Sequence, residues 1–196
     1  MRPSILVDVD GVLADFTKAA LDLVHQVTGR QYKPSDVRTW EVFDSIPEPE
    51  AKKEVYGLLK GRGGCMGIPV YEGAKEEFTK LRELADVVVV TSPFVGSEAW
   101  AHERELWLYA HFGIKPKDII HAHKKERIHG NLFLDDKPEH IKDWLGYWVL
   151  SRRDTSCLGI VWETDRTINE PVPIGAHVAK SWDDVRRLVR IRTSMG

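Results

Sequence analysis

The most constraining feature of the sequence is an apolar run near the amino terminus that ends in two aspartates, ILVDVDG. The apolar residues predict a strand buried on both faces, as in a parallel sheet covered by helices. In an extended strand, Asp8 and Asp10 point to the same face with their Cα atoms about 6.6 Å apart. Two buried carboxylates at this separation repel each other, so they need a cation or a retained proton. A bound cation and a retained proton are both typical of a catalytic site.

Two further predicted strands also end in polar residues. The segment DVVVVTS ends in Thr91 and Ser92, and NLFLDD ends in Asp135 and Asp136. Segments with helical spacing of apolar residues separate these strands, which predicts parallel crossover connections. The carboxyl ends of parallel strands meet at one edge of an α/β sheet, and open α/β sheets bind their ligands there. The sequence therefore predicts an α/β fold in which three strands deliver polar side chains to one edge.

The segment of residues 30–69 departs from this alternation. It mixes aromatic residues, prolines and the loose stretch KGRGGCMG, with one helical candidate at about residues 50–60 and no convincing strand. We therefore expect a catalytic core made of residues 1–29 and 70–196. Residues 30–69 form a small, mostly helical insertion, to which the helix from about residue 15 contributes.

Local signals predict where several helices begin and end. Asp15 can cap a helix that Gly29 ends, and this structural role is favoured over a role as a ligand. Ser97 can cap a helix whose tryptophans are expected in the core. Ser181 with Asp184 resembles a capping box at the start of a closing helix. The segment LGIVW predicts a further strand.

The composition excludes several classes of protein. The chain has 28 Lys and Arg residues and 30 Asp and Glu residues. The resulting formal charge of −2 gives no general attraction to a nucleic acid polymer or a membrane surface. Cys65 and Cys157 lack CxxC spacing, and His121 and His123 lack a third placed ligand, so neither a disulfide scaffold nor a zinc site is predicted. No leader or long apolar run is evident, so we expect a cytoplasmic protein.

Four motifs in order carry a family resemblance: DVDGVLADF, VVVVTSP, a lysine within HKKERIHG, and LFLDDKPEH. This series resembles the haloacid dehalogenase (HAD) superfamily, and it is most similar to the 5'(3')-deoxyribonucleotidase branch. The peptides IPVYEGAKE and TSPFVGSEAW are also similar to that branch. The resemblance covers residues 5 to about 188, although the insertion is similar only in length and in having aromatic residues. It implies a Rossmann-like HAD core, a parallel sheet flanked by helices, with a cap between the first and second motifs.

The resemblance implies phosphoryl transfer through an aspartyl-phosphate intermediate. Asp8 would be the nucleophile, and Asp10 would serve as general acid and then general base. Magnesium suits hard oxygen ligands, here Asp8, the backbone carbonyl of Asp10 and Asp135. Adjacent side chains on a strand point oppositely, so only one of the paired aspartates faces the ion. By resemblance we assign Asp135 as a ligand of the ion. Asp136 is expected to lie behind Asp135, without direct contact to the ion.

Three side chains are expected to bind the phosphate. Thr91 and Ser92 would use hydroxyl and backbone N–H groups, and a lysine would neutralise the remaining charge. Lys125 lies ten residues before Asp135, the spacing expected of the third motif, and Lys124 is the alternative.

The insertion should decide what the phosphate is attached to. Phe16 matches in position the residue with which the nucleotidase branch stacks the base, and Trp40 and Phe43 could form the opposite wall or merely the core of the insertion. The expected substrate is a small-molecule phosphate ester, a (deoxy)ribonucleoside monophosphate. A HAD phosphatase for a non-nucleotide metabolite and a catalytically silent phosphate-binding protein remain as alternatives. The sequence leaves open the base, the sugar, the ester position and whether the protein is a homodimer.

Overall fold

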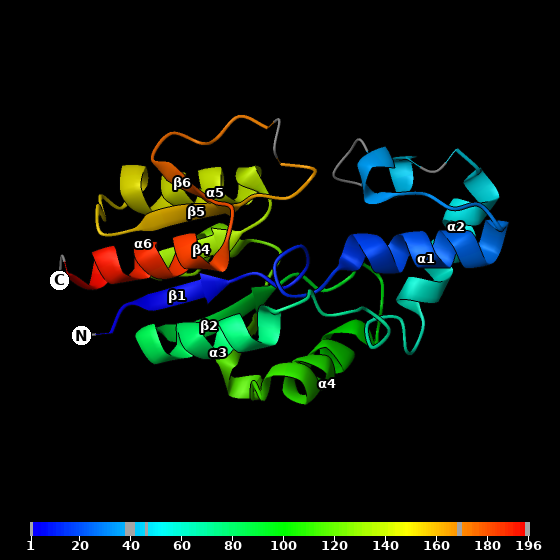
Figure 1. Ribbon diagram of the computed structural model, residues 1–196, viewed down its shortest axis with the longest axis horizontal. Coiled ribbons are helices and arrows are strands. Elements are labelled where there is room, and N and C mark those ends of the chain that lie inside the picture. Colours follow the sequence, from blue (N-terminus) through cyan, green and yellow to red (C-terminus); the bar gives the residue numbers. More distant parts are fainter. Residues whose placement is uncertain (1, 38–41, 46, 168–169, 195–196) are drawn as a thin grey trace.

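The computed structural model describes residues 2–37, 42–45, 47–167 and 170–194 (Figure 1). Its described strands form one six-stranded sheet in which every neighbouring pair is parallel. They are β1 (Ser4–Val7), β2 (Asp86–Thr91), β3 (Ile119–His121), β4 (Leu132–Asp135), β5 (Leu158–Trp162) and β6 (Ala176–Ala179). The strand order is β3-β2-β1-β4-β5-β6, so the strand that leads to the two aspartates lies in the middle.

Helices cover both faces of this sheet (Figure 1). They are α1 (Phe16–Thr28), α2 (Pro49–Lys60), α3 (Ala74–Leu84), α4 (Trp100–Phe112), α5 (Pro138–Leu145) and α6 (Trp182–Ser194). The described residues also form five short helical turns: η1 (Pro34–Asp36), η2 (Val42–Ser45), η3 (Pro116–Asp118), η4 (Lys125–Arg127) and the π-helix η5 (Gly146–Ser151). This is the Rossmann-like α/β fold that the sequence predicts.

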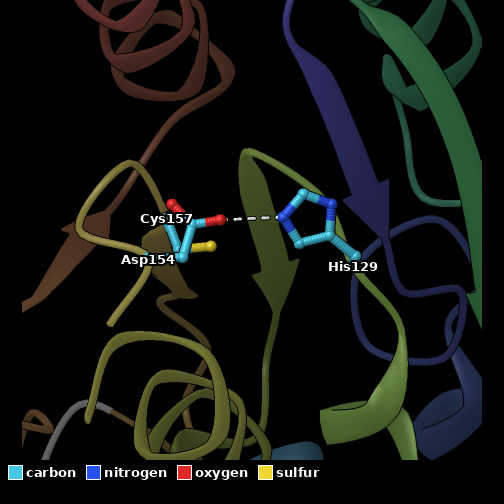
Figure 2. A group of neighbouring side chains, drawn as sticks. All are labelled: His129, Asp154 and Cys157. Atoms are coloured by element: carbon cyan, nitrogen blue, oxygen red, sulfur yellow. Dashed lines mark hydrogen bonds and ion pairs between the residues drawn. The ribbon is translucent and has the colours of Figure 1, made fainter. Parts of the chain in front are cut away.

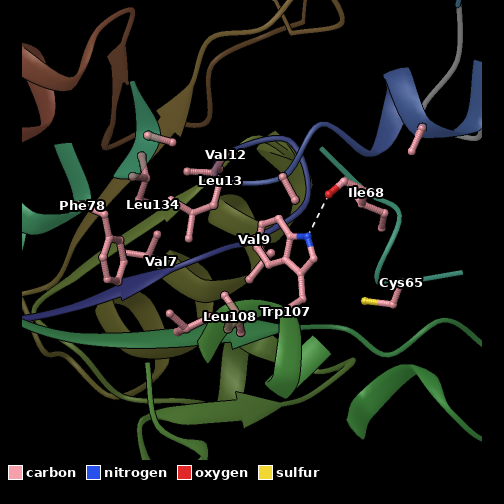
Figure 3. Packing of buried hydrophobic residues seen from close by; sticks show 14 of the residues in the cluster. Val7, Val9, Val12, Leu13, Cys65, Ile68, Phe78, Trp107, Leu108 and Leu134 are labelled. Atoms are coloured by element: carbon pink, nitrogen blue, oxygen red, sulfur yellow. Dashed lines mark hydrogen bonds between the residues drawn. The ribbon is translucent and has the colours of Figure 1, made fainter. Parts of the chain in front are cut away.

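The alternation of side chains along β1 divides the core into two layers. Ile5 and Val7 pack with α3, α4 and α6, whereas Leu6 packs with α5 on the other face. Figure 3 shows part of the first layer, where Val7 lies near Phe78 and Leu108. All the side chains of β1 after Ser4 are buried, which is why the strand reads as a continuous apolar run.

The register brings the carboxyl ends of three strands together. Val7 pairs with Val89 of β2 on one side and with Leu134 of β4 on the other. The N–H of Asp8 donates to the carbonyl of Leu134 at 2.9 Å, so the ladder continues into the first aspartate. The residues that follow these strands must therefore meet at one edge, as the sequence predicts.

The described part of residues 30–69, which we call the lid, lies beyond that edge (Figure 1). It contains α2, which confirms the predicted helix, and α2 packs alongside α1. The two chain segments that join this lid to the core are hydrogen-bonded to each other. The N–H of Asp15 donates to Pro69 O at 2.8 Å, and the N–H of Tyr71 donates to Leu13 O at 3.0 Å. The exact boundaries of core and lid stay a prediction.

Helix α4 holds the segment that returns from the lid. The indole N–H of Trp107 donates to Ile68 O at 2.8 Å (Figure 3). The carboxylate of Glu103 accepts the backbone N–H groups of Gly63 at 2.7 Å and Cys65 at 3.3 Å. The path out of α2 is therefore fixed by side chains of the core rather than by its own glycine-rich sequence.

The predicted helix ends are correct with one exception. Asp15 accepts the N–H of Lys18 at 2.9 Å, and Gly29 ends α1 in a left-handed conformation. Ser97 lies outside α4, which begins at Trp100. Its hydroxyl accepts the Trp100 N–H at 3.2 Å and donates to a carbonyl of α2 at 2.7 Å, so it joins the helix to the lid.

Among the elements near the carboxyl terminus, two agree with the sequence prediction and one does not. LGIVW forms β5, and the closing helix α6 begins directly after Ser181, as predicted. Strand β6 is not predicted, because its sequence AHVA is short and lacks a clear alternation. It forms where β5 offers an unpaired edge. Every helix in the described part of the chain is too short or too polar to cross a bilayer.

Replacing Trp107 by Phe should destabilise the protein. The substitution leaves the buried carbonyl of Ile68 without its donor and removes part of a fully buried ring, for a loss of roughly 2 kcal/mol in the free energy of unfolding. Urea unfolding measures this loss. The control is Leu106→Ala on the same helix, which is 47% exposed and should change stability by less than about 0.5 kcal/mol. Equal effects of the two substitutions would contradict the role given to Trp107.

Candidate active site

A tight turn after β1 presents Asp8 and Asp10. The carbonyl of Val9 accepts the N–H groups of Leu13 and Ala14, each at 2.8 Å, and Gly11 takes a φ of +87°. A Cβ at Gly11 would lie 2.0 Å from a carboxylate oxygen of Asp136. Only glycine therefore allows the turn after β1 to approach the end of β4 this closely.

Lys125 lies between two of the predicted aspartates. Its Nζ is 2.7 Å from Asp8 Oδ1 and 2.9 Å from Asp135 Oδ2, and the side chain is only 3% exposed. Burial alone would lower the pKa of Lys125, but the Asp135 and Asp8 carboxylates together raise it above its ordinary value. The ammonium is therefore a permanent charge at the carboxyl edge of the sheet. Lys124, the alternative, is exposed.

Asp135 is fully buried and its oxygens are already engaged. Besides Lys125, they accept the backbone N–H of Lys137 at 2.8 Å and approach Nδ1 of His140 at 3.0 and 3.1 Å. Burial raises the pKa of Asp135, but Lys125 and His140 outweigh this and hold it below the ordinary range. The Asp135 carboxylate therefore stays ionised as part of a closed network.

Asp136 points the other way, into the cavity described below. Its Oδ2 lies 3.1 Å from Nη2 of Arg166, and its side chain meets Gly11. Burial, with a smaller contribution from Asp135, raises the pKa of Asp136 well above its ordinary value. The sequence resemblance assigns the ion to Asp135 and places Asp136 behind it. The contacts instead favour Asp136 as the ligand of the ion, because the ammonium of Lys125 already lies beside Asp135.

Asp10 is held by an arginine from α4. Nη2 of Arg104 lies 2.7 and 2.9 Å from the two carboxylate oxygens of Asp10. Arg104 itself is fully buried, with its guanidinium 5.2 Å from the ring centre of Trp100 and 5.3 Å from that of Trp107. The Asp10 side chain remains 29% exposed. The carboxylate of Asp10 therefore faces the cavity, and the buried guanidinium of Arg104 sets its orientation.

The two hydroxyl residues at the end of β2 differ in their hydrogen bonds. Thr91 is fully buried, and its Oγ1 has no hydrogen-bond partner among the described residues. Ser92 lines the cavity, and its Oγ donates to the carbonyl of Ala122 at 3.0 Å. A buried hydroxyl without a partner is costly. Thr91 is not among the residues that line the cavity described below, whereas Ser92 is.

One cavity of about 440 Å³ joins these groups to the lid. Its polar end includes Asp8, Asp10, Lys125 and Asp136. Its other end is lined by aromatic and apolar side chains from both lid and core, namely Phe16, Val42, Phe43, Tyr56, Phe94 and Trp100. Trp40, which the sequence places as a candidate for this wall, lies outside the described residues.

The aromatic side chains form a continuous series of ring contacts. The ring centre of Phe16 lies 6.4 Å from that of Phe43 and 6.3 Å from that of Phe94. Tyr56 closes the series, at 4.3 Å from Phe43 and 5.3 Å from Phe94. The cavity therefore offers ring faces and edges at one end and charged oxygens at the other.

Comparison with known proteins decides the family. A family model described as "5' nucleotidase, deoxy (Pyrimidine), cytosolic type C protein" matches residues 2–194. The chain belongs to this family of HAD-type 5'-nucleotidases. It is therefore an enzyme of the phosphoric monoester hydrolases, which confirms the resemblance seen in the sequence and disfavours a silent binding protein.

Individual relatives agree with this assignment. A Bordetella bronchiseptica protein provisionally named as a 5'(3')-deoxyribonucleotidase is 31% identical over 143 residues, 68% of this chain and 74% of its own. A haloacid dehalogenase-like hydrolase of Burkholderia xenovorans superposes with a TM-score of 0.61 at 15% identity, covering 97% of each chain. The HAD-hydrolase YfnB of Bacillus subtilis, solved bound to magnesium, gives 0.55 at 12% identity, covering 96% of this chain and 99% of its own. These two structures are similar in fold.

The charges of this nucleotidase fit a bound divalent cation. Four carboxylates and four cationic side chains meet at the site, and they are Asp8, Asp10, Asp135 and Asp136 with Arg104, Lys125, Lys137 and Arg166. With these groups ionised, their charges balance. A phosphate monoester brings close to two negative charges at neutral pH. A divalent cation would offset the charge of the phosphate.

The donor atoms of the site also suit magnesium. Asp8 and Asp136 supply carboxylate oxygens to the cavity, and these are the hard donors that magnesium prefers. His140 comes within 4.8 Å of Asp8 and Asp135, but the ammonium of Lys125 already lies between those two carboxylates. The residues present therefore fit a divalent cation better on the Asp136 side of Asp8 than on the Asp135 side.

Three side chains that contact the carboxylates of the site are not predicted from the sequence, and neither are Tyr56 and Phe94 of the cavity wall. Arg104 carries a detectable signal, because it lies on the buried face of α4 between Trp100 and Trp107. His140 is the last residue of the fourth motif and lies in the first turn of α5, but no role for it is predicted from the sequence. Arg166 comes from the connection between β5 and β6, which has no periodic pattern, so no local signal points to it.

Replacing Asp8 by Asn should stabilise the metal-free protein at neutral and alkaline pH. Burial, then the charge of Asp135, raises the pKa of Asp8 from 3.8 to about 7, so the folded state favours the protonated carboxyl. Stability is therefore lost as the pH rises from about 4 to about 7, and asparagine escapes this loss. With a chelator present, the advantage of the variant should grow across that window, to at most a few kcal/mol, and then stay constant.

Thermal unfolding from about pH 4 to pH 8 measures the effect. The matched control is Asp15→Asn, because asparagine caps a helix as well as aspartate does, and it should follow the parent profile. A constant difference between Asp8→Asn and the parent at every pH would contradict the argument.

Proposed function

We propose that this nucleotidase is a magnesium-dependent phosphomonoesterase that hydrolyses deoxyribonucleoside monophosphates to nucleoside and phosphate. The observation that best supports this proposal is the cavity that is lined both by Asp8 and Asp10 and by the aromatic side chains of the lid. A phosphate at the acidic end would leave the organic part of the ester among the rings. The cytosolic type in the family description supports a cytoplasmic location.

The chemistry begins at Asp8. Its carboxylate attacks phosphorus in line with the departing oxygen, so that an aspartyl-phosphate forms and the nucleoside leaves. Lys125 holds the Asp8 carboxylate at 2.7 Å and adds positive charge beside the transferred group. The hydroxyl of Thr91, which is buried without a partner among the described residues, would donate a hydrogen bond to a phosphate oxygen when the substrate binds.

Asp10 would move the protons. It gives a proton to the departing ester oxygen and then takes one from the water that attacks the aspartyl-phosphate, which restores Asp8. Arg104 fixes the direction of the Asp10 carboxylate through Nη2. A carboxylate held in this way acts on the same reacting line in both steps, because its orientation does not depend on the substrate.

Magnesium would be held by Asp8, Asp136 and the backbone carbonyl of Asp10. When bound, it supplies positive charge that offsets the charge of the phosphate. Asp136 is preferred over Asp135 because Asp136 lines the cavity and meets Gly11 in the turn after β1. Asp135 would instead hold Lys125 in place.

The aromatic end of the cavity would bind the base. Phe16 lies at the start of α1, and its ring contacts Phe43 from the lid and Phe94 from the core. Base stacking on such rings contributes roughly 1 to 3 kcal/mol per base and tolerates any base. The cavity therefore favours nucleotides over aliphatic esters without choosing strongly among bases.

Two asparagine variants test the metal ligands. We expect Asp136→Asn to raise the magnesium concentration for half-maximal activity by more than about 100-fold, beyond the 10–100-fold typical of partners outside the coordination shell. Asp135→Asn should lower kcat through Lys125 with a smaller shift in the magnesium requirement. Phosphate release against magnesium concentration gives both values. If the magnesium concentration for half-maximal activity rises more in Asp135→Asn than in Asp136→Asn, Asp135 is the metal ligand and the proposal is wrong on this point.

A substrate panel tests the function itself. Deoxyribonucleoside monophosphates should have a higher kcat/KM than sugar and glycerol phosphates, and Asp8→Asn should be inactive toward all of them. Phe16→Leu should lower kcat/KM for nucleotides by roughly 5- to 150-fold, the equivalent of one lost stacking contact, and leave glycerol phosphate unchanged. If sugar phosphates are the better substrates, the enzyme is a phosphatase for another metabolite.

A further inference from the structure

A second group of potential metal ligands lies away from the active-site cavity. His129, Asp154 and Cys157 place one ring nitrogen, one carboxylate oxygen and one sulfur within 4.8 Å of one another (Figure 2). His129 lies shortly before β4, and Asp154 and Cys157 lie shortly before β5. They are therefore at the amino ends of these strands, the edge of the sheet opposite to Asp135 and Asp136.

Local contacts prepare the three donors. Oδ1 of Asp154 accepts the N–H of Ser156 at 3.0 Å and its hydroxyl at 2.5 Å, which leaves Oδ2 directed at Nε2 of His129, 2.9 Å away. The N–H of Cys157 donates to Asp154 O at 3.3 Å, so the spacing Asp-x-x-Cys forms a compact turn. The ring of His129 packs edge-on against Trp148, at 4.6 Å between ring centres.

We propose that His129, Asp154 and Cys157 form a second metal site, which binds Zn²⁺ with water as the fourth ligand. Thiolate, imidazole and carboxylate are the ligands that zinc takes in tetrahedral sites with one open position. Zinc bonds of about 2.0 to 2.3 Å place tetrahedral donors about 3.3 to 3.7 Å apart, so shifts of about 1 Å suffice.

The proton balance of the site is simple. Binding requires the sulfur of Cys157 to lose its proton, which passes to solvent, while the other two donors bind through a neutral imidazole and an ionised carboxylate. In the metal-free protein, Cys157 donates weakly to Gly130 O at 3.4 Å, and its side chain is buried. Burial and then Asp154 raise the pKa of this thiol to about 12.

The consequence of binding is a clamp between two loops. The loops that carry His129 and Cys157 lead directly into β4 and β5, which are neighbours in the sheet. A metal that binds only the folded chain stabilises it by mass action. The site would therefore raise the melting temperature without changing the groups that act on the substrate.

Cobalt titration of the full chain, with magnesium in excess to occupy the active site, tests the second site. Thiolate ligation gives Co²⁺ a sulfur-to-metal charge-transfer band, which oxygen ligands do not give. We expect one equivalent of Co²⁺ to develop this band, Zn²⁺ to bleach it, and Cys157→Ser to abolish it. Cys65→Ser is the control and should keep the band, because Cys65 belongs to no group of three ligands among the described residues.

His129→Gln covers the case in which Cys157→Ser fails to fold, because the His129 side chain is 51% exposed. Competition with a chromophoric chelator should show at least tenfold weaker Zn²⁺ binding in this variant. Its nucleotidase activity and its melting temperature with chelator should match the parent, and the Zn²⁺-dependent rise in melting temperature should be lost. Absence of the cobalt band in the parent, or equal Zn²⁺ affinity in His129→Gln, would overturn the proposal.

Discussion

The ion pairs of Lys125 are the interaction on which the rest of the site depends. Carboxylates that follow β1 and end β4 would repel each other across adjacent strands, and the buried ammonium between Asp8 and Asp135 offsets this repulsion. Without Lys125, the two buried carboxylates would face each other with no ammonium between them. The network also leaves Asp8 with a carboxylate oxygen for chemistry, because Lys125 is nearest to Oδ1.

Helix α4 links the lid to Asp10, for which we propose the role of proton transfer. Two consecutive residues do this: Glu103 holds the backbone of the segment that returns from α2, and Arg104 holds the carboxylate of Asp10. The tryptophans on either side of Arg104 fix the guanidinium by packing, since both are buried. The position of the lid and the orientation of Asp10 are therefore set by one rigid element.

In the proposed function, one part of the cavity carries the chemistry and another part selects the substrate. Its acidic end comes from the turns after the central strands, which the sheet holds in register. Its aromatic end combines α1, η2 and α2 with Phe94 and Trp100 of the core. Changes in the lid can therefore alter what is bound while the reacting groups keep their geometry, which is the usual division of roles in folds that carry many activities.

Much of this organisation could be predicted from the sequence. Apolar runs that end in acid or hydroxyl residues located β1, β2 and β4, and their order along the chain implied a common edge. These features are local, because burial on both faces and the crossover helices leave a periodic pattern in the sequence. The spacing from the fourth motif also favoured Lys125 over Lys124.

The tertiary structure decided the rest. Whether Asp135 or Asp136 faces the cavity depends on which way β4 is turned against Lys125 and Gly11, and alternation along a strand is the same for both choices. Arg104 and Arg166 reach the site from segments far away in the chain, and β6 forms only because β5 offers it a pairing edge. The sequence by itself determined the fold and the chemical type of the site, because these follow from local patterning; the partner of each charge arose from packing between distant segments, which no local pattern records.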